Sequence, residues 1–289
     1  MAIALMAGSA IAVSPLVSAQ GRQHSIYASA LNEQGAPVEG LIPTDFQVRE
    51  DKTAREVLTV RPATDPMQIA LLIDNSAAAD PFIRDYREAL AAFIDTIAAD
   101  DGVQHQVAVI TVAERPTINT DYTQDLARAK TGTQRIFSLP GSGTYLLDGI
   151  IETSKGITKR EAARPVIVAI TSEGPELSER VYQSVLEPLK ESGATLHVIV
   201  VGRPINNDTD RAMVLARGTN DSGGRYETVL ASSGLPMRLK QVAVDLTSQY
   251  LVTYARPESL IPPEAITIGS NKPGVTVRGT PAKAPKDVR

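Results

Sequence analysis

One stretch constrains the fold of this chain more than any other: the five apolar residues 69–73, followed at once by Asp74, Asn75 and Ser76. An uninterrupted apolar run of this length, rich in branched side chains, is typical of a strand buried on both faces of a parallel sheet. Open α/β sheets bind ligands beyond the carboxyl ends of their strands, because the connecting loops diverge there. The run therefore predicts a binding crevice at Asp74 and Ser76.

Strands of the same buried type recur along residues 67–249, and segments with helical apolar spacing separate them. This alternation predicts an α/β fold with a doubly wound, mostly parallel sheet. Residues 20–63 and 250–280 instead show the period-two alternation of half-exposed strands. We expect these two segments to join in one small β-sandwich, with Phe46 and Tyr254 in a shared core. The Pro- and Lys-containing tail, residues 281–289, is predicted to be disordered.

The composition excludes several classes of function. A net charge of −4 and a pI near 5.5 argue against binding to nucleic acid, which requires a basic surface. The chain contains no cysteine, so disulfides, thiolate metal sites and cysteine nucleophiles are excluded. Lys and Arg are scattered along the predicted helices, where we expect solvated side chains.

The N-terminal residues 1–19 resemble an export signal. They are uncharged, apolar or small throughout, and they end in Val17-Ser18-Ala19, a pattern suited to signal peptidase. The sequence therefore predicts an exported protein, either periplasmic or secreted to the cell surface. The usual positive region is missing, which leaves an uncleaved membrane anchor or a mis-assigned start as alternatives. Pro15 and the small residues favour cleavage over a stable transmembrane helix.

Three short motifs together resemble a known family. They are Asp-Asn-Ser-Ala-Ala at 74–78, Gly-Thr at 143–144, and Thr-Ser-Glu-Gly at 171–174. These motifs look like the three loops of a von Willebrand factor A (VWFA) domain, and the predicted strand order over 67–249 fits that domain. Residues 35–51 are similar to the β module that precedes this domain in a bacterial, largely exported group of VWFA-related proteins.

The resemblance implies a metal-ion-dependent adhesion site, in which an Asp-x-Ser-x-Ser loop, a Thr and an Asp hold Mg²⁺ or Mn²⁺ for an acidic group of the partner. In this chain Asp74, Ser76 and Thr144 match the metal-ligand positions. Ala78 replaces the second serine of the motif, and Ser172 replaces its aspartate. The site is therefore expected to be degenerate. Two interpretations stay open: a remnant that still binds Mg²⁺ or Mn²⁺, and polar side chains that only tie down loops.

The function implied by the resemblance is non-enzymatic binding of another protein, with no nucleic acid and no membrane contact beyond the possible N-terminal anchor. The predicted contact residues in the loops are Asn75, Ser142, Ser172 and Glu173. Glu173 could also substitute for the missing acid, although strand alternation would point it elsewhere.

No catalytic residue is predicted. The sequence has no nucleophile elbow, no dinucleotide glycine fingerprint and no P-loop lysine. His24, His105 and His197 have no companion at ligand spacing, and His197 reads as a hydrogen-bonded core histidine. Two alternatives remain. One is a small-ligand-binding protein or enzyme that uses the strand-end crevice, because fold does not fix function. The other is a structural protein of the cell envelope.

Overall fold

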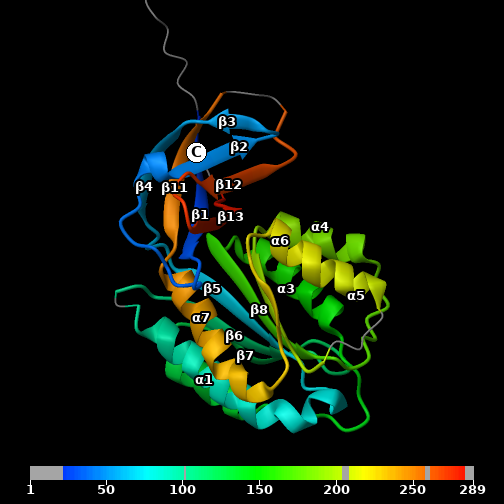
Figure 1. Ribbon diagram of the computed structural model, residues 1–289. Coiled ribbons are helices and arrows are strands. Elements are labelled where there is room, and N and C mark those ends of the chain that lie inside the picture. Colours follow the sequence, from blue (N-terminus) through cyan, green and yellow to red (C-terminus); the bar gives the residue numbers. More distant parts are fainter. Residues whose placement is uncertain (1–21, 101, 204–207, 258–260, 284–289) are drawn as a thin grey trace, which may run out of the picture.

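A six-stranded sheet forms the centre of the computed structural model (Figure 1), which describes residues 22–100, 102–203, 208–257 and 261–283. The strand order is β10-β9-β8-β5-β6-β7. Neighbouring strands run parallel except at the edge, where β7 is antiparallel to β6. The bounds are β5 Met67–Ile73, β6 Gln106–Thr111, β7 Thr117–Thr123, β8 Arg164–Ser172, β9 Thr195–Val201 and β10 Tyr226–Val229. The predicted doubly wound, mostly parallel sheet is confirmed.

Helices cover both faces of this sheet (Figure 1). One face carries α1 (Ile83–Ala98), α2 (Leu126–Gln134) and α7 (Leu235–Thr247). The other carries α3 (Leu146–Arg160), α4 (Tyr182–Ser192), α5 (Thr209–Met213), the π-helical turn η3 (Val214–Gly218) and α6 (Thr219–Asp221). Short 3-10 turns lie at η1 (Pro43–Asp45), η2 (Ala77–Phe82) and η4 (Ser232–Gly234).

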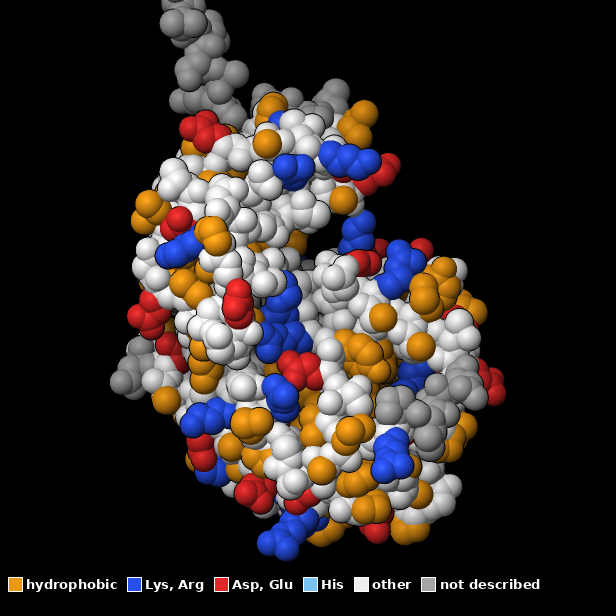
Figure 2. All heavy atoms as spheres, in the orientation of Figure 1, with side chains coloured by type: hydrophobic (Ala, Val, Ile, Leu, Met, Phe, Trp, Pro, Cys, Tyr) orange, Lys and Arg blue, Asp and Glu red, His pale blue; other side chains and the backbone are white. Residues whose placement is uncertain are grey.

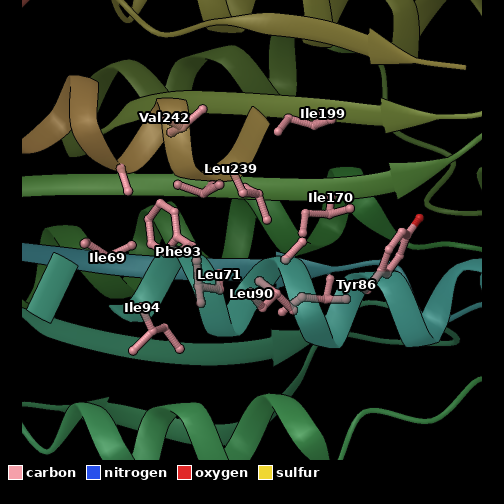
Figure 3. Close-up of a cluster of buried hydrophobic side chains, with 14 of the residues drawn as sticks. Ile69, Leu71, Tyr86, Leu90, Phe93, Ile94, Ile170, Ile199, Leu239 and Val242 are labelled. Atoms are coloured by element: carbon pink, nitrogen blue, oxygen red, sulfur yellow. The ribbon is translucent and has the colours of Figure 1, made fainter. Parts of the chain in front are cut away.

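Strand β5 shows why residues 69–73 are all apolar. Ile69 and Leu71 point into the core beneath α1 and α7, which Figure 3 shows, whereas Ala70 and Leu72 belong to the core beneath α3 and α4. Because successive side chains of a strand point to opposite faces, a strand covered on both faces needs an apolar residue at each position.

The first and last described segments of the chain form two antiparallel sheets at one end of the molecule (Figure 1). Strand β1 pairs with both β11 and β13, so the first and last described segments share a sheet of order β13-β1-β11-β4. A second sheet has the order β12-β2-β3. The bounds are β1 Arg22–Asn32, β2 Phe46–Glu50, β3 Thr53–Arg55, β4 Val57–Pro62, β11 Tyr250–Arg256, β12 Ile266–Ser270 and β13 Val275–Pro281. Phe46 and Tyr254 lie in one buried cluster, as predicted.

The two ends of the chain differ in how far the structure describes them. Strand β13 extends to Pro281, and the Ala282 N–H donates to the Ser25 carbonyl at 2.8 Å, so regular structure continues past the predicted start of the tail. The predicted signal, residues 1–19, and residues 284–289 lie outside the described part. Among the described helices, none has the length and apolar character needed to cross a membrane.

Arg164 joins the terminal sheets to the α/β part, and its position was not predicted from the sequence. It is buried at the first position of β8. Its guanidinium donates to the carbonyls of Ala63 at 3.3 Å and Asp65 at 3.1 Å. It also donates to the Leu246 carbonyl at 2.5 Å and to Gln249 Oε1 at 2.9 Å. Burial lowers the pKa of Arg164 to about 10, so the group stays charged at neutral pH.

A second charged junction lies nearby. Arg278 of β13 donates to the Gly224 carbonyl at 2.7 Å and to the buried Asp245 of α7 at 2.8 Å. Arg225 Nε lies 3.9 Å from the same Asp245 carboxylate. Figure 2 shows basic and acidic side chains gathered on this face of the molecule, over the region of β10 and α7. These contacts attach β13 to both β10 and α7.

His197 of β9 lies in the core, as expected, but the expectation that it is hydrogen-bonded is wrong. Among the residues that the structure describes, neither ring nitrogen has a hydrogen-bond partner. Burial lowers the pKa of His197 to about 4, and this effect outweighs the opposing effect of the nearby Asp245. A neutral imidazole is therefore held in an apolar strand beside the charged junction.

Candidate functional site

The predicted crevice lies at the switch point of the sheet. From β5 the chain builds β6 and β7 on one side and then crosses back to build β8, β9 and β10 on the other. Asp74 directly follows β5, and Ser172 is the last residue of the neighbouring strand β8. The Asp74 N–H donates to the Ile170 carbonyl at 2.8 Å, which holds the two strand ends together. Ligands of doubly wound sheets bind at this position.

Asp74 is fully buried, and uncharged donors satisfy its carboxylate. Oδ1 accepts the Ser76 N–H at 2.9 Å. Oδ2 accepts both the N–H of Ser172 at 2.9 Å and its hydroxyl at 2.7 Å, and the Thr171 hydroxyl lies 3.3 Å away. Hydrogen bonds of this kind compensate a buried carboxylate for the loss of water. Ser172 therefore donates hydrogen bonds to Asp74 from the position at which the resemblance implies a second acid.

Ser76 and Thr144, the other two matched ligand positions, are also fully buried. Within the described ranges, neither hydroxyl oxygen has a hydrogen-bond partner. Thr144 is fixed by its backbone, since its N–H donates to the Pro175 carbonyl at 2.9 Å and its carbonyl accepts the Leu177 N–H at 2.8 Å. The site thus has two buried hydroxyls without a hydrogen-bond partner, both at metal-ligand positions. This is the feature of the site that suits a bound cation or water molecule.

Gly174 packs the loops tightly together. A Cβ atom at Gly174 would lie 2.6 Å from the Ala78 methyl, 3.6 Å from Ser172 Oγ and 3.7 Å from Ser76 Oγ. The structure therefore brings together the first and third loops around the backbone of a glycine. The Ala78 methyl occupies the place next to this glycine, where the resemblance implies a second serine hydroxyl.

Taken together, the side chains at this site do not suit the coordination of a resident divalent cation. Mg²⁺ prefers several hard oxygen ligands, and carboxylates usually provide the charge. Here the one carboxylate in the site, that of Asp74, already accepts hydrogen bonds on both oxygens. No cluster of three acidic, histidine or cysteine side chains suited to a metal occurs in the described part of the chain. The two hydroxyls alone are weak, uncharged ligands.

The other predicted loop residues take different positions. Asn75 ties loops together, because its amide donates to the Phe137 carbonyl at 2.9 Å and accepts the Ala113 N–H at 3.0 Å. Ser142 is half-buried, and its hydroxyl donates to the Leu139 carbonyl at 2.7 Å. Glu173 faces Arg211, with 3.6 Å between Oε2 and Nη1.

Two residues of this region were not predicted. Arg211 of α5 is buried, which corrects the expectation that the basic side chains of the helices are solvated. Its Nη2 donates to the Ser172 carbonyl at 2.9 Å. Glu176 accepts the N–H of Ser178 at 3.1 Å and its hydroxyl at 2.5 Å, while Ser178 Oγ accepts the Asp148 N–H at 3.1 Å. Burial raises the pKa of Glu176 to about 7. This loop caps the N-terminus of α3 from a distant part of the sequence, which no local capping signal could reveal.

Exposed apolar side chains surround the loops. The Leu139 N–H donates to the Asn75 carbonyl at 2.8 Å, and the Leu177 side chain packs against the backbone of Gly143. The exposed members of this apolar rim are Phe137, Leu139, Leu177 and Val181. Grouped apolar side chains on a surface are typical of an interface with another protein.

Comparison with known proteins identifies the fold. No protein-family model matches the chain, and no curated protein does. Among solved structures, a von Willebrand factor type A protein from Catenulispora acidiphila matches 94% of this chain and 76% of its own, with a TM-score of 0.52 and 12% identity. Proximal thread matrix protein 1 from the mussel byssus, solved with a zinc-occupied adhesion-site motif, matches 69% of this chain with a TM-score of 0.51 and 17% identity.

This chain spans about half the length of the mussel protein, at 50% coverage. At these identities the likeness shows the fold. The protein is an α/β protein with the von Willebrand factor A fold and additional antiparallel sheets built from both ends of the chain.

Proposed function

We propose that this protein is an exported, non-enzymatic module that binds another protein through the loops after β5, before α3 and after β8, without a resident metal ion. The pairing of the Asp74 carboxylate with the N–H and hydroxyl of Ser172 carries the proposal. These donors stabilise the buried charge as a cation would, and the apolar rim offers a surface for a protein partner. In this proposal residues 67–249 form the binding domain, and residues 20–63 and 250–280 form its β support.

The titratable groups near the crevice support a binding role over an enzymatic one. Asp74 uses both carboxylate oxygens to hold loops, and Glu176 binds Ser178, whose hydroxyl oxygen accepts the Asp148 N–H in the first turn of α3. His105 bonds to the Met67 N–H at 3.0 Å and to Asp100 at 2.9 Å, at the opposite end of β5. An enzyme needs several such groups that converge on one substrate position. We therefore propose no catalytic residue.

Metal independence can be tested by thermal melts of residues 20–289 in chelator and in Mg²⁺ or Mn²⁺. We expect no shift of the wild-type melting temperature. The double variant Ala78→Ser/Ser172→Asp restores the second hydroxyl and the second acid of the motif, so we expect cations to stabilise it. Binding to the folded state at 100 times the dissociation constant adds about 2.7 kcal/mol.

Asp74→Ala added to the double variant is the control, and it should abolish the cation effect. A cation-dependent shift in the wild-type protein that disappears in Asp74→Ala would contradict the metal-free proposal. It would direct the search to a partner whose acidic group completes the coordination of a cation.

The binding surface can be tested by placing a photo-crosslinking amino acid at Ser142 in cells that export the protein. We expect a discrete crosslinked protein, because Ser142 lies half-buried on the loop next to the apolar rim. The matched position is Lys159, which is exposed in the last turn of α3, at the other end of that helix from Thr144. Equal products at both positions, or none at Ser142, would contradict the proposed surface.

A further inference from the structure

A second pocket lies between the edge strand β7 and helix α2, away from the loops described above. Its volume is about 280 Å³, and its lining residues are Asn119, Thr120, Arg128, Thr131, Gly132 and Arg135. We propose that this pocket binds a tetrahedral oxyanion of the phosphate or sulfate class, either free or as a group on a larger ligand. The proposal does not depend on the function assigned to the strand-end loops.

The helix presents its basic residues on one face. Arg128, Thr131 and Arg135 follow one another at i, i+3 and i+7, so they share a face of α2. The buried residues of α2 are Ala129, Gly132 and Thr133. The two exposed arginines therefore lie one on each side of Thr131, at the rim of the pocket.

Both arginines are available to a ligand. Over the described residues, neither the Arg128 nor the Arg135 guanidinium takes part in a hydrogen bond or an ion pair. The neighbouring basic groups are already engaged, since Lys130 lies 2.7 Å from the Asp95 carboxylate and Arg87 Nε donates to the Ile136 carbonyl at 2.9 Å. None of the described residues that line the pocket is acidic. Guanidinium groups bind phosphate-type oxyanions through paired N–H donors.

Asn119 adds a third donor. Its Oδ1 accepts the Thr111 hydroxyl at 3.3 Å, so its amide N–H groups remain for a ligand. The Thr131 hydroxyl donates to the Ala127 carbonyl at 3.0 Å, so we do not count it among the donors to a ligand. Among the described lining residues, the two guanidinium groups and the Asn119 amide therefore offer unused N–H donors, and this favours an anion over a cation.

The close packing of α2 on β7 shapes this pocket. A Cβ atom at Gly132 would lie 2.2 Å from Thr120 Oγ1, so only a glycine allows the helix to approach the strand here. The volume is near the lower limit for small-molecule sites, which suits one compact group. The protein as a whole carries a net charge of −4. Non-specific attraction of anions is therefore unfavourable, and binding must come from the local arginines.

The test is a titration of residues 20–289 with inorganic phosphate and, separately, with sulfate, at constant ionic strength against sodium chloride. Calorimetry and the NMR shift of the Asn119 side-chain amide provide two readouts. We expect saturable binding of at least one oxyanion, and the arm that saturates identifies which one. In Arg128→Ala/Arg135→Ala the affinity should fall about tenfold or more, as expected for the loss of charge-assisted hydrogen bonds.

Arg84→Ala is the matched control, because Arg84 is an exposed arginine of α1 outside the pocket, and it should bind like the wild type. The variant Arg128→Lys/Arg135→Lys keeps the charge but loses the paired donors, so we expect intermediate affinity. A response no larger than that of chloride would overturn the proposal. So would unchanged affinity in the double alanine variant with an unchanged melting temperature.

Discussion

Replacing Arg164 by methionine is expected to lower the free energy of unfolding by about 3–5 kcal/mol, because hydrogen bonds from a charged donor are lost and buried acceptors are left without a partner, at about 1–3 kcal/mol each. The guanidinium donates to Ala63, Asp65 and Leu246 carbonyls and to the Gln249 side chain. Methionine fills a similar volume but provides no donor. The carbonyls of Ala63 and Leu246 would then lose a partner in a buried place.

Urea denaturation of the variant and the wild type measures this effect. Arg61→Met is the matched control, because Arg61 lies next to the same junction but is exposed and 4.0 Å from Asp65. Exposed ion pairs contribute about 0–1 kcal/mol, so the control should unfold close to the wild type. If Arg164→Met lost no more stability than Arg61→Met, the junction would not depend on this arginine.

His197→Leu is expected to remove a large part of the acid sensitivity of the protein. The pKa of His197 is lowered to about 4 in the folded state, from its ordinary value of 6.5. Between these two pH values the unfolded chain binds a proton that the folded chain does not, so the wild type loses stability as the pH falls from 6.5 to 4. A shift of this size corresponds to about 3 kcal/mol. Leucine at this position carries no titrating group.

The measurement is urea denaturation at several values between pH 7 and pH 4. The gap in stability between His197→Leu and the wild type should widen as the pH falls. The charged groups around the imidazole, Asp245, Arg225 and Arg278, are the same in both proteins, so the difference isolates His197. His24→Leu is the control, with a smaller pH effect because His24 is half-buried. Parallel curves for the wild type and His197→Leu would contradict the prediction.

Local patterns in the sequence determined which segments form the sheet and which faces are buried. The run at 69–73 predicted a strand covered on both sides, and Ile69 and Ala70 indeed face opposite cores. The alternation around Phe46 and Tyr254 predicted a shared core for segments more than 200 residues apart, and a hydrogen bond from the Tyr254 hydroxyl to Glu50 Oε1, at 2.8 Å, accompanies it. Periodicity succeeds here because it depends on residues two to four positions apart.

The tertiary structure alone decided the polar contacts. The sequence showed that Ser172 replaces an acid, but only the adjacency of β5 and β8 shows that its hydroxyl and N–H bind Asp74. The sequence indicated that His197 is a hydrogen-bonded core histidine, which was wrong, and it gave no sign that Arg164 is buried. A hydrogen bond is short and directional, and its partners here come from segments that distant crossovers bring together. No pattern within a few residues can encode that geometry.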